Sequence, residues 1–199
     1  MQQKQAPLAG SIADRVSQGL AGSPTSRAFA ELLYAKQADD VLAPLGDTGL
    51  EANARAAAAF IADKPAGQYK IAVRAVDVAG RPASVVEILN DDMPFLVDSV
   101  LGEVQARGLA VDLLLHPIFL AHRDGAGHLL SLSPPPPGGG AGLESYISLL
   151  LPPLSEAMAA DITTSLAAIL DDVRVAVLDW QAMRARVRAE MERLARQAG

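Results

Sequence analysis

The first third of the chain has apolar residues at helical spacing. In the segment 11–20 they recur every four positions, at Ile12, Val16 and Leu20, so they share one face of a helix. Two more helices are expected over 25–34 and over 50–62, where alanine, the best helix former, is frequent. A loop between these helices is predicted by Pro44, Gly46 and Gly49. The pattern predicts a helical amino-terminal segment over 1–67.

The period then changes from that of a helix to that of a strand. Apolar and polar residues alternate over 69–78, which predicts a strand with one face on a core. The stretch 83–89 is apolar almost throughout, which predicts a strand buried on both faces. A turn at Gly80, Arg81 and Pro82 separates the two strands, so we expect them to form a hairpin.

The remaining elements follow from the same periodicities. A helix is expected over 96–107, with Gly108 at its end. The strand-like run 109–122 contains Pro117, which cannot donate to a ladder and predicts a bulge or an edge position. After a turn at 123–127, the segment 128–132 is expected to complete a hairpin. Three further segments are a loop over 133–142, a strand over 144–151, and one or two helices over 155–197.

The order of these elements predicts the fold class. From position 83 onward the order is strand, helix, strand, strand, helix, which is most of a ferredoxin-like α+β fold with an antiparallel sheet and helices on one face. The closing strand of that fold is missing after Trp180, so its place falls to the 69–78 strand or to another chain. We therefore expect a helical segment over 1–67, an α+β domain over 68–180, and a charged helical tail over 181–199.

Composition excludes several classes of function. With 17 Lys and Arg against 23 Asp and Glu, the formal charge is −6, so neither nucleic acid nor an anionic membrane is an expected partner. Cysteine is absent from the sequence, which excludes disulfides and thiolate chemistry. No apolar run approaches the roughly 20 residues of a membrane span, and the first ten residues lack the apolar core of a signal peptide. We expect a cytoplasmic protein.

The stretch 90–100, NDDMPFLVDSV, is the main candidate for chemistry. Asp91 and Asp92 are adjacent carboxylates that could form an acid–base pair. Adjacent side chains point in different directions, however, and no nucleophile or histidine accompanies them in the same element. Capping of the following helix by these aspartates, with Pro94 in its first turn, is therefore favoured over catalysis.

Other candidate sites are weaker. His116, His122 and His128 are six residues apart, but Pro117 and a turn interrupt the series, so ordinary histidines are favoured over a metal site. The loop GGGAG follows four prolines rather than a strand, and no phosphate-binding glycine motif is present. Trp180 falls in the apolar stripe of the last helix and is predicted to be a core residue. We predict no catalytic residues, no metal and no cofactor in this chain.

Two motifs nevertheless resemble a known family. The stretches VVEILNDDMPFLVDSV and RGLAVDLLLHPIFLAHRDGAGHLLSL resemble the amino-terminal region of the large bacterial NAD-specific glutamate dehydrogenases. The strand at Glu144 to Ile147 and the stretch DVRVAVLDW are also similar to that family, so that the likeness extends from about Phe29 to Arg186. The resemblance implies that this chain is a fragment or a truncated relative of a longer enzyme, which oxidises glutamate to 2-oxoglutarate with NAD in a downstream domain.

The same region resembles ACT domains, which are regulatory modules that bind amino acids. Their motif Asp-x-Pro-Gly-x-Leu corresponds here to the segment Asp92 to Val97, with Phe95 where glycine is usual. A phenylalanine there would obstruct or fill the place where a ligand carboxylate meets the helix. The resemblance implies a ligand-binding loop made of Asn90, Asp91, Asp92, Met93, Pro94 and Phe95.

These resemblances lead to a functional expectation. We expect a noncatalytic, ACT-like domain that regulates or assembles a large NAD-dependent glutamate dehydrogenase, with an amino acid as its effector. Its expected partners are the downstream domains of the enzyme and further copies of the chain in a homo-oligomer. The alternative is a purely structural oligomerisation domain that binds no ligand, and a small stand-alone enzyme with Asp91 or Asp92 as base is a third reading.

Overall fold

The computed structural model describes residues 11–20, 22 and 24–197. The chain divides into two compact units, one made of Met1–Asp92 and Val111–Leu154, the other of Met93–Ala110 and Ser155–Gly199. The first ten positions, for which the sequence predicts part of the helical segment and no signal peptide, lie outside the described residues. No helix in the described part of the chain is long and apolar enough to cross a membrane.

The first unit begins with a layer of helices. They are α1 (Ile12–Gly19), α2 (Pro24–Tyr34), α3 (Asp39–Leu42), the 3-10 helix η1 (Ala43–Leu45) and α4 (Gly46–Ile61). Ser11 begins α1 with a capping box, in which its hydroxyl accepts from the Asp14 N–H and the Asp14 carboxylate accepts from the Ser11 N–H. The prediction of helices over 11–20 and 25–34 is thus confirmed.

The prediction of a loop around positions 44–49 is wrong. The chain there is η1 followed directly by α4, which begins at Gly46 rather than at Leu50. Gly46 has a φ of 67° and makes the turn between the two helices. Tertiary packing outweighs the low helix propensity of glycine in this segment, because Leu50 and Ala54 on the same helix are completely buried.

The sheet of the first unit is antiparallel. Its strands are β1 (Lys70–Val78), β2 (Arg81–Asp91), β3 (Leu113–Leu115), β4 (Ile118–Arg123), β5 (Leu129–Ser133) and β6 (Leu143–Leu151). The order is β1-β2-β6-β4-β5, with β3 also pairing with β6. This confirms the α+β class with a ferredoxin-like antiparallel sheet. Since β1 lies beside β2, it occupies the place of the closing strand that the sequence lacks after Trp180.

Both predicted hairpins are present. β1 and β2 pair in continuous register from Lys70 with Leu89 to Val78 with Arg81. β4 and β5 form the second hairpin, with a register shift between His122 and Arg123. The strand predicted over 109–122 begins only at Leu113 and is divided at Pro117, which has no N–H to donate but whose carbonyl accepts from the Tyr146 N–H at 3.1 Å.

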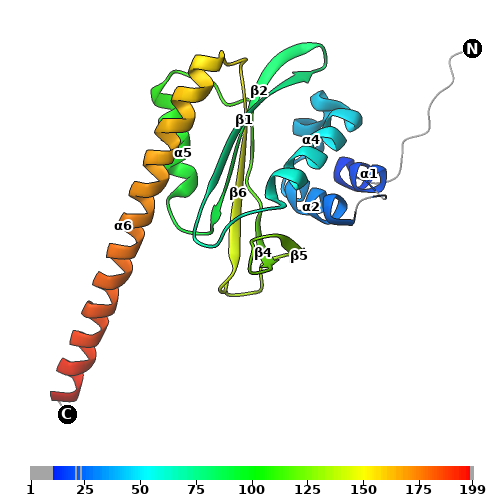
Figure 1. Cartoon of the computed structure of the whole chain (residues 1–199). Coiled ribbons are helices and arrows are strands. Elements are labelled where there is room, and N and C mark those ends of the chain that lie inside the picture. The colour runs from blue at the N-terminus through cyan, green and yellow to red at the C-terminus, as the bar shows by residue number, and fades with distance from the viewer. Residues whose placement is uncertain (1–10, 21, 23, 198–199) are drawn as a thin grey trace, which may run out of the picture. The chain divides into compact units, whose positions relative to one another are not determined.

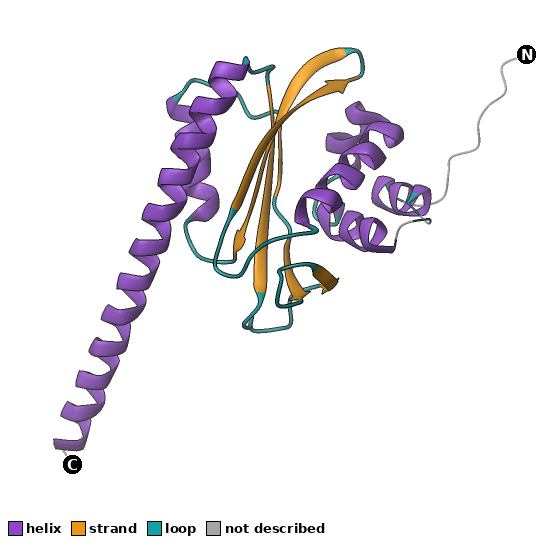
Figure 2. Ribbon diagram, in the orientation of Figure 1, coloured by secondary structure: helices purple, strands orange, loops and turns teal. Residues whose placement is uncertain are grey.

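The helical layer of the first unit packs on one face of its sheet (Figures 1 and 2). The shared core includes an aromatic cluster, in which Phe29 of α2 meets the rings of Phe119 and Tyr146 edge-on at centroid distances of 5.5 and 5.3 Å. On the opposite face of the sheet Val86, Ile88, Ile147 and Leu149 are also buried, which confirms that β2 is buried on both faces.

A buried polar network joins this helical layer to the sheet. Glu87 is 2 % exposed, and its carboxylate accepts from the Tyr146 hydroxyl at 2.6 Å and from Arg74 Nε at 2.8 Å. Arg74 also donates to the side chain of Asn53 on α4. Burial raises the pKa of Tyr146 well above that of an ordinary tyrosine, with the Glu87 carboxylate acting in the same direction, so this hydroxyl remains a donor.

The second unit consists of two helices, α5 (Leu96–Ala106) and α6 (Glu156–Gln197). Polar contacts join them, because Glu103 accepts from the Ser165 hydroxyl at 2.6 Å and Arg107, which follows α5, pairs with Asp161. The sequence predicts one or two helices after position 155, and the structure has a single helix of 42 residues. Trp180 is 39 % exposed, so its prediction as a core residue is wrong.

Candidate functional site

The two aspartates of the opening motif do not cap the helix. The residue that precedes α5 is Phe95, and no side chain makes a capping hydrogen bond there. Asp91 is the last residue of β2, and the N–H of Asp92 donates to the Leu143 carbonyl at 2.9 Å. The capping prediction and the place of Pro94 in the first helical turn are therefore wrong, because α5 begins only at Leu96.

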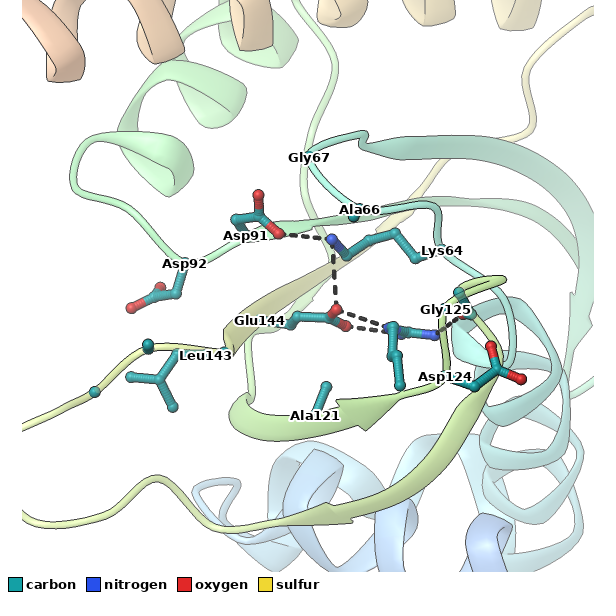
Figure 3. A pocket seen from close by; sticks show the side chains of 15 residues that line it. Lys64, Ala66, Gly67, Asp91, Asp92, Ala121, Asp124, Gly125, Leu143 and Glu144 are labelled. Atoms are coloured by element: carbon teal, nitrogen blue, oxygen red, sulfur yellow. Dashed lines mark hydrogen bonds and ion pairs between the residues drawn. The ribbon is translucent and has the colours of Figure 1, made fainter.

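Asp91 and Asp92 instead line a pocket of about 500 Å³ in the first unit (Figure 3). Its other walls come from the chain after α4, the end of β4 with the following turn, and the glycine-rich segment that leads into β6. The lining residues used below are Lys64, Asp91, Asp92, Arg123, Asp124 and Glu144. The pocket is thus built at one end of the strands, where the chain leaves β2 and enters β6.

A four-membered ion-pair network forms the floor of this pocket. Lys64 Nζ lies 2.6 Å from Asp91 Oδ1 and 3.4 Å from Glu144 Oε1. Arg123 donates to both oxygens of Glu144, each at 2.8 Å, in the bidentate geometry that is strongest for these groups. Lys64, Arg123 and Glu144 have side chains that are 2, 11 and 6 % exposed, whereas Asp91 is 45 % exposed and faces the opening.

Arg123 and the backbone around it hold the network in place. Its guanidinium also donates to the carbonyls of Ile61 and Gly127, both at 2.9 Å. The Lys64 N–H donates to the same Gly127 carbonyl at 3.0 Å, and Leu129 N–H donates to the Ala62 carbonyl at 2.7 Å. The end of α4, β4 and the β4–β5 turn are therefore joined at this one arginine.

The carboxyl of Asp92 has a different environment from that of Asp91. Burial raises the pKa of Asp92, and nearby His116 acts in the opposite direction. Burial likewise lowers the pKa of His116, with the Asp92 carboxylate opposing it. His116 contacts the Ser145 hydroxyl through Nε2 at 2.6 Å. Asp92 is thus a half-buried carboxyl that borders the pocket and has no capping role.

The formal charge of the pocket lining decides which ligands suit it. Four carboxylates, those of Asp91, Asp92, Asp124 and Glu144, face only two cations, Lys64 and Arg123. Both cations are already paired with carboxylates. The excess of two acids favours an ammonium or guanidinium group over an anion, because an added anion would be repelled by Asp91 and Asp92.

The structure separates the six residues that the sequence predicts as a ligand loop. Asp91 and Asp92 line the pocket. Asn90 is completely buried in β2, where its side-chain oxygen accepts from the Asp91 N–H at 2.9 Å. Met93, Pro94 and Phe95 belong to the second unit and are absent from the described lining. Sequence reasoning missed Lys64, Arg123 and Glu144, which lie far from the motif in the chain.

Phe95 has a left-handed backbone conformation. Its φ is 72° and its ψ −3°, in the left-handed region that glycine adopts readily. The ring is 56 % exposed, so it does not fill a cavity in this chain. Phe95 therefore adopts this conformation although it carries a Cβ.

The three histidines lie in different settings. His116 follows β3, His122 is within β4, and His128 accompanies β5, where its Nδ1 lies 2.9 Å from Asp124. Within the part of the chain that the structure describes, no group of three or more acidic or histidine side chains could hold a metal ion. The favoured reading of ordinary histidines stays a prediction.

Most of the chain is similar to one family of known proteins. Residues 29–166, which run from α2 into α6, match the family described as "Glutamate dehydrogenase, ACT1 domain". The chain belongs to this family. This ACT1 domain is also 36 % identical over 111 residues to an NAD-specific glutamate dehydrogenase of Halomonas elongata, and 31 % identical over 107 residues to one of Pseudomonas aeruginosa.

The ACT1 domain corresponds to a small part of these relatives. The alignments cover 55 and 53 % of this chain but only 7 % of each relative's length. No solved structure matches it. The resemblance to the amino-terminal ACT-like region of this dehydrogenase family, inferred from NDDMPFLVDSV and its neighbours, is confirmed.

Proposed function

We propose that this ACT1 domain is a noncatalytic regulatory module of a large NAD-dependent glutamate dehydrogenase and binds an amino acid in the pocket beside Asp91 and Asp92. The parent reaction would convert L-glutamate and NAD to 2-oxoglutarate and ammonia, in the cytoplasm, with NAD bound by other domains. The pocket carries this proposal, because Asp91 and Asp92 of the stretch NDDMPFLVDSV line it and its lining has an excess of acids.

The charge of the pocket indicates the effector. A ligand with a cationic side chain, such as arginine or lysine, would place an ammonium or guanidinium group near Asp91, which is the most exposed acid of the ion-pair network. Binding would draw Asp91 away from Lys64 and so couple occupancy to the strand end and to the turn held by Arg123. In the parent enzyme, such coupling would bias the conformation of a homo-oligomer.

Titration calorimetry with arginine, lysine, glutamate and aspartate tests this proposal. We expect heat with a basic amino acid and an affinity lowered at least tenfold by Asp91→Asn, which corresponds to about 1.4 kcal/mol. Asp40→Asn, at an exposed carboxylate of α3 outside the pocket lining, is the matched control and should leave the affinity unchanged. Binding that is insensitive to Asp91→Asn would place the ligand elsewhere.

One observation favours the alternative of a purely structural domain. Lys64, Arg123 and Glu144 are buried and pair with one another, as expected if the network only fixes the fold. No heat with any of the four amino acids, in protein that is folded by circular dichroism, would support this alternative.

A further inference from the structure

Apolar residues of α6 are buried in the first half of the helix and exposed in the second half. The buried residues recur in steps of three and four along one face and are Ile162, Leu166, Leu170, Val173 and Val177. Ile162, Leu166 and Val173 are at most 7 % exposed. Met183 and Val187 have the same spacing but are 57 and 55 % exposed, and Met191 one turn later is 66 % exposed.

We call Met183, Val187 and Met191 the distal stripe. Each is a large apolar side chain, and neighbouring members are four residues apart, so they line one side of the helix. Isolated exposed apolar residues are common, but a row of them along one side of an otherwise charged helical segment is typical of an interaction surface.

The charges along α6 indicate what covers this stripe. Positions 156–179 carry five acidic residues and one arginine, whereas positions 180–197 carry five arginines and two glutamates. The helix is therefore acidic before the distal stripe and basic around it. A second copy of the same helix, laid antiparallel, brings the basic end of each helix beside Asp179 and toward Asp171 and Asp172 of the other.

A parallel pair would have the opposite electrostatics. It would place Arg186 and Arg188 of one helix next to the same residues of the other, which is repulsive. From this exposed apolar row and the charge polarity of the helix we infer that the distal stripe of α6 is a self-association surface, which pairs antiparallel with a second copy of this chain through a crossing near Met183. This surface is independent of the amino-acid pocket, so either proposal can fail alone.

Sedimentation velocity over a hundredfold dilution series tests the association. We expect a monomer–dimer equilibrium for the chain, and at least a tenfold weaker dimer for Met183→Glu and for Val187→Glu. Leu178→Glu is the matched control, because Leu178 is 59 % exposed on the same helix but lies off the stripe, and it should associate like the unchanged chain. Circular dichroism confirms that each variant is folded. A chain that stays monomeric throughout, or loses its dimer equally with Leu178→Glu, overturns the inference.

Single cysteines test the antiparallel orientation, and the chain has none of its own to interfere. In an antiparallel pair that crosses near Met183, two cysteines at that position are close together, whereas two at position 191 are about 24 Å apart along the axis, at 1.5 Å per residue. A short bismaleimide should therefore cross-link M183C into dimers and leave M191C largely monomeric. Equal cross-linking of both variants indicates a parallel pair and overturns the orientation.

Discussion

Arg123 connects three separate parts of the chain through one side chain. Its guanidinium binds the carboxylate of Glu144 on β6, the carbonyl of Ile61 at the end of α4, and the carbonyl of Gly127 in the β4–β5 turn. The side chain is 11 % exposed, and because its guanidinium is planar and makes several of these bonds at once, it loses less freedom per hydrogen bond. Its removal leaves Glu144 buried with only the more distant Lys64 as a partner.

Replacing this arginine should therefore be costly. Arg123→Met is expected to lower the free energy of unfolding by about 3 kcal/mol, as when one member of a buried ion pair is removed. The matched control is Arg27→Met, which breaks an exposed Arg–Glu pair on α2 and should cost less than about 0.5 kcal/mol. Urea unfolding followed by circular dichroism measures both, and equal costs would show that the pocket network contributes no more than a surface pair.

His116 and His128 are shifted in opposite directions by their surroundings. Burial lowers the pKa of His116, whereas hydrogen bonding to Asp124 raises the pKa of His128. His116 therefore costs stability when the pH falls below its unfolded pKa, because folding disfavours its protonated form. The contribution of His128 is fully present below its unfolded pKa and is lost as the pH rises through its raised folded pKa.

Nuclear magnetic resonance titration of the imidazole protons can check both directions. We expect His116 to titrate below 6.5 and His128 above 6.5, the ordinary histidine value. Asp92→Asn should lower the pKa of His116 further, since it removes the carboxylate that opposes the burial effect. Asp124→Asn should lower only the pKa of His128. A shift of His128 by Asp92→Asn, or of His116 by Asp124→Asn, would contradict the geometry of the site.

Phe95 has a left-handed backbone conformation without glycine's freedom to adopt it. The conformation costs a residue with a Cβ roughly 1–2 kcal/mol, and the exposed ring recovers little by burial. Phe95→Gly is therefore expected to raise the free energy of unfolding by up to about 1 kcal/mol, after the loss of chain entropy that glycine brings. Phe95→Val should lower it, because β-branched residues tolerate this region least. Thermal unfolding in both variants measures the difference.

The residues of the site could be predicted from the sequence only in part. Asp91 and Asp92 stood out because they are adjacent in the chain, but the role assigned to them was local capping. The partner of Asp91 is Lys64, which is 27 positions away and approaches through the fold of the first unit. An ion pair between residues so far apart in the chain leaves no pattern within a single helix or strand. Lys64 and Arg123 could therefore not be predicted from the sequence.

At the scale of elements, Gly127 is the closest point between the β4–β5 turn and the chain after α4. It has a φ of 93°, and a Cβ built on it would lie 2.5 Å from the Lys64 carbonyl oxygen. Both the conformation and the lack of space require glycine there. The hairpin and the helix end can approach because this one residue has no side chain.

Substitution of this glycine should disrupt the approach. Gly127→Ala is expected to lower the free energy of unfolding by about 2 kcal/mol. Gly125→Ala, two residues earlier in the same turn, has nothing within 4 Å of the added methyl group and should change stability by no more than about 0.5 kcal/mol. Chemical denaturation measures the free energy of unfolding of both variants. Similar losses in the two variants would contradict the role given to the close approach at Gly127.

Elements with a strong period were predicted well, and those decided by packing were not. The alternation over 69–78 predicted β1, whose positions are half-buried or exposed, and the apolar run over 83–89 predicted β2, which is buried on both faces. The glycines near position 49 predicted a loop that α4 replaces. Local propensity favours a break there, but the burial of Leu50 and Ala54 against the rest of the first unit outweighs it.

At the scale of the whole molecule, stability and association should be separable. The described side chains beyond Trp180 are exposed, so they contribute little to the folded state of a single chain. A chain that ends at Gln181 is therefore expected to lose the proposed dimer. Its free energy of unfolding, measured with urea, should change by no more than about 0.5 kcal/mol. Measuring both at a concentration where the full chain is monomeric, and again where it is dimeric, checks the separation. A large loss of monomer stability would contradict it.

The order of the strands and helices could be predicted from the sequence, whereas the boundaries of the two compact units could not. The order strand, helix, strand, strand, helix gave the ferredoxin-like class, because few arrangements of these elements satisfy short connections and an antiparallel sheet. The division into units was not accessible, since both of them combine segments from distant parts of the chain. Contacts between such segments depend on side chains that no local pattern links.

The position of Lys64 has a practical consequence for anyone who dissects this protein. The natural place to cut is before Tyr69, where the helical segment gives way to the first strand. A fragment that starts there retains every strand but loses the lysine beneath Asp91 and Glu144, and with it the carbonyls of Ile61 and Ala62 that receive Arg123. Such a fragment would leave Asp91 without its lysine and Arg123 without two of its carbonyl acceptors, so affinity measurements on an excised strand domain would describe a different site.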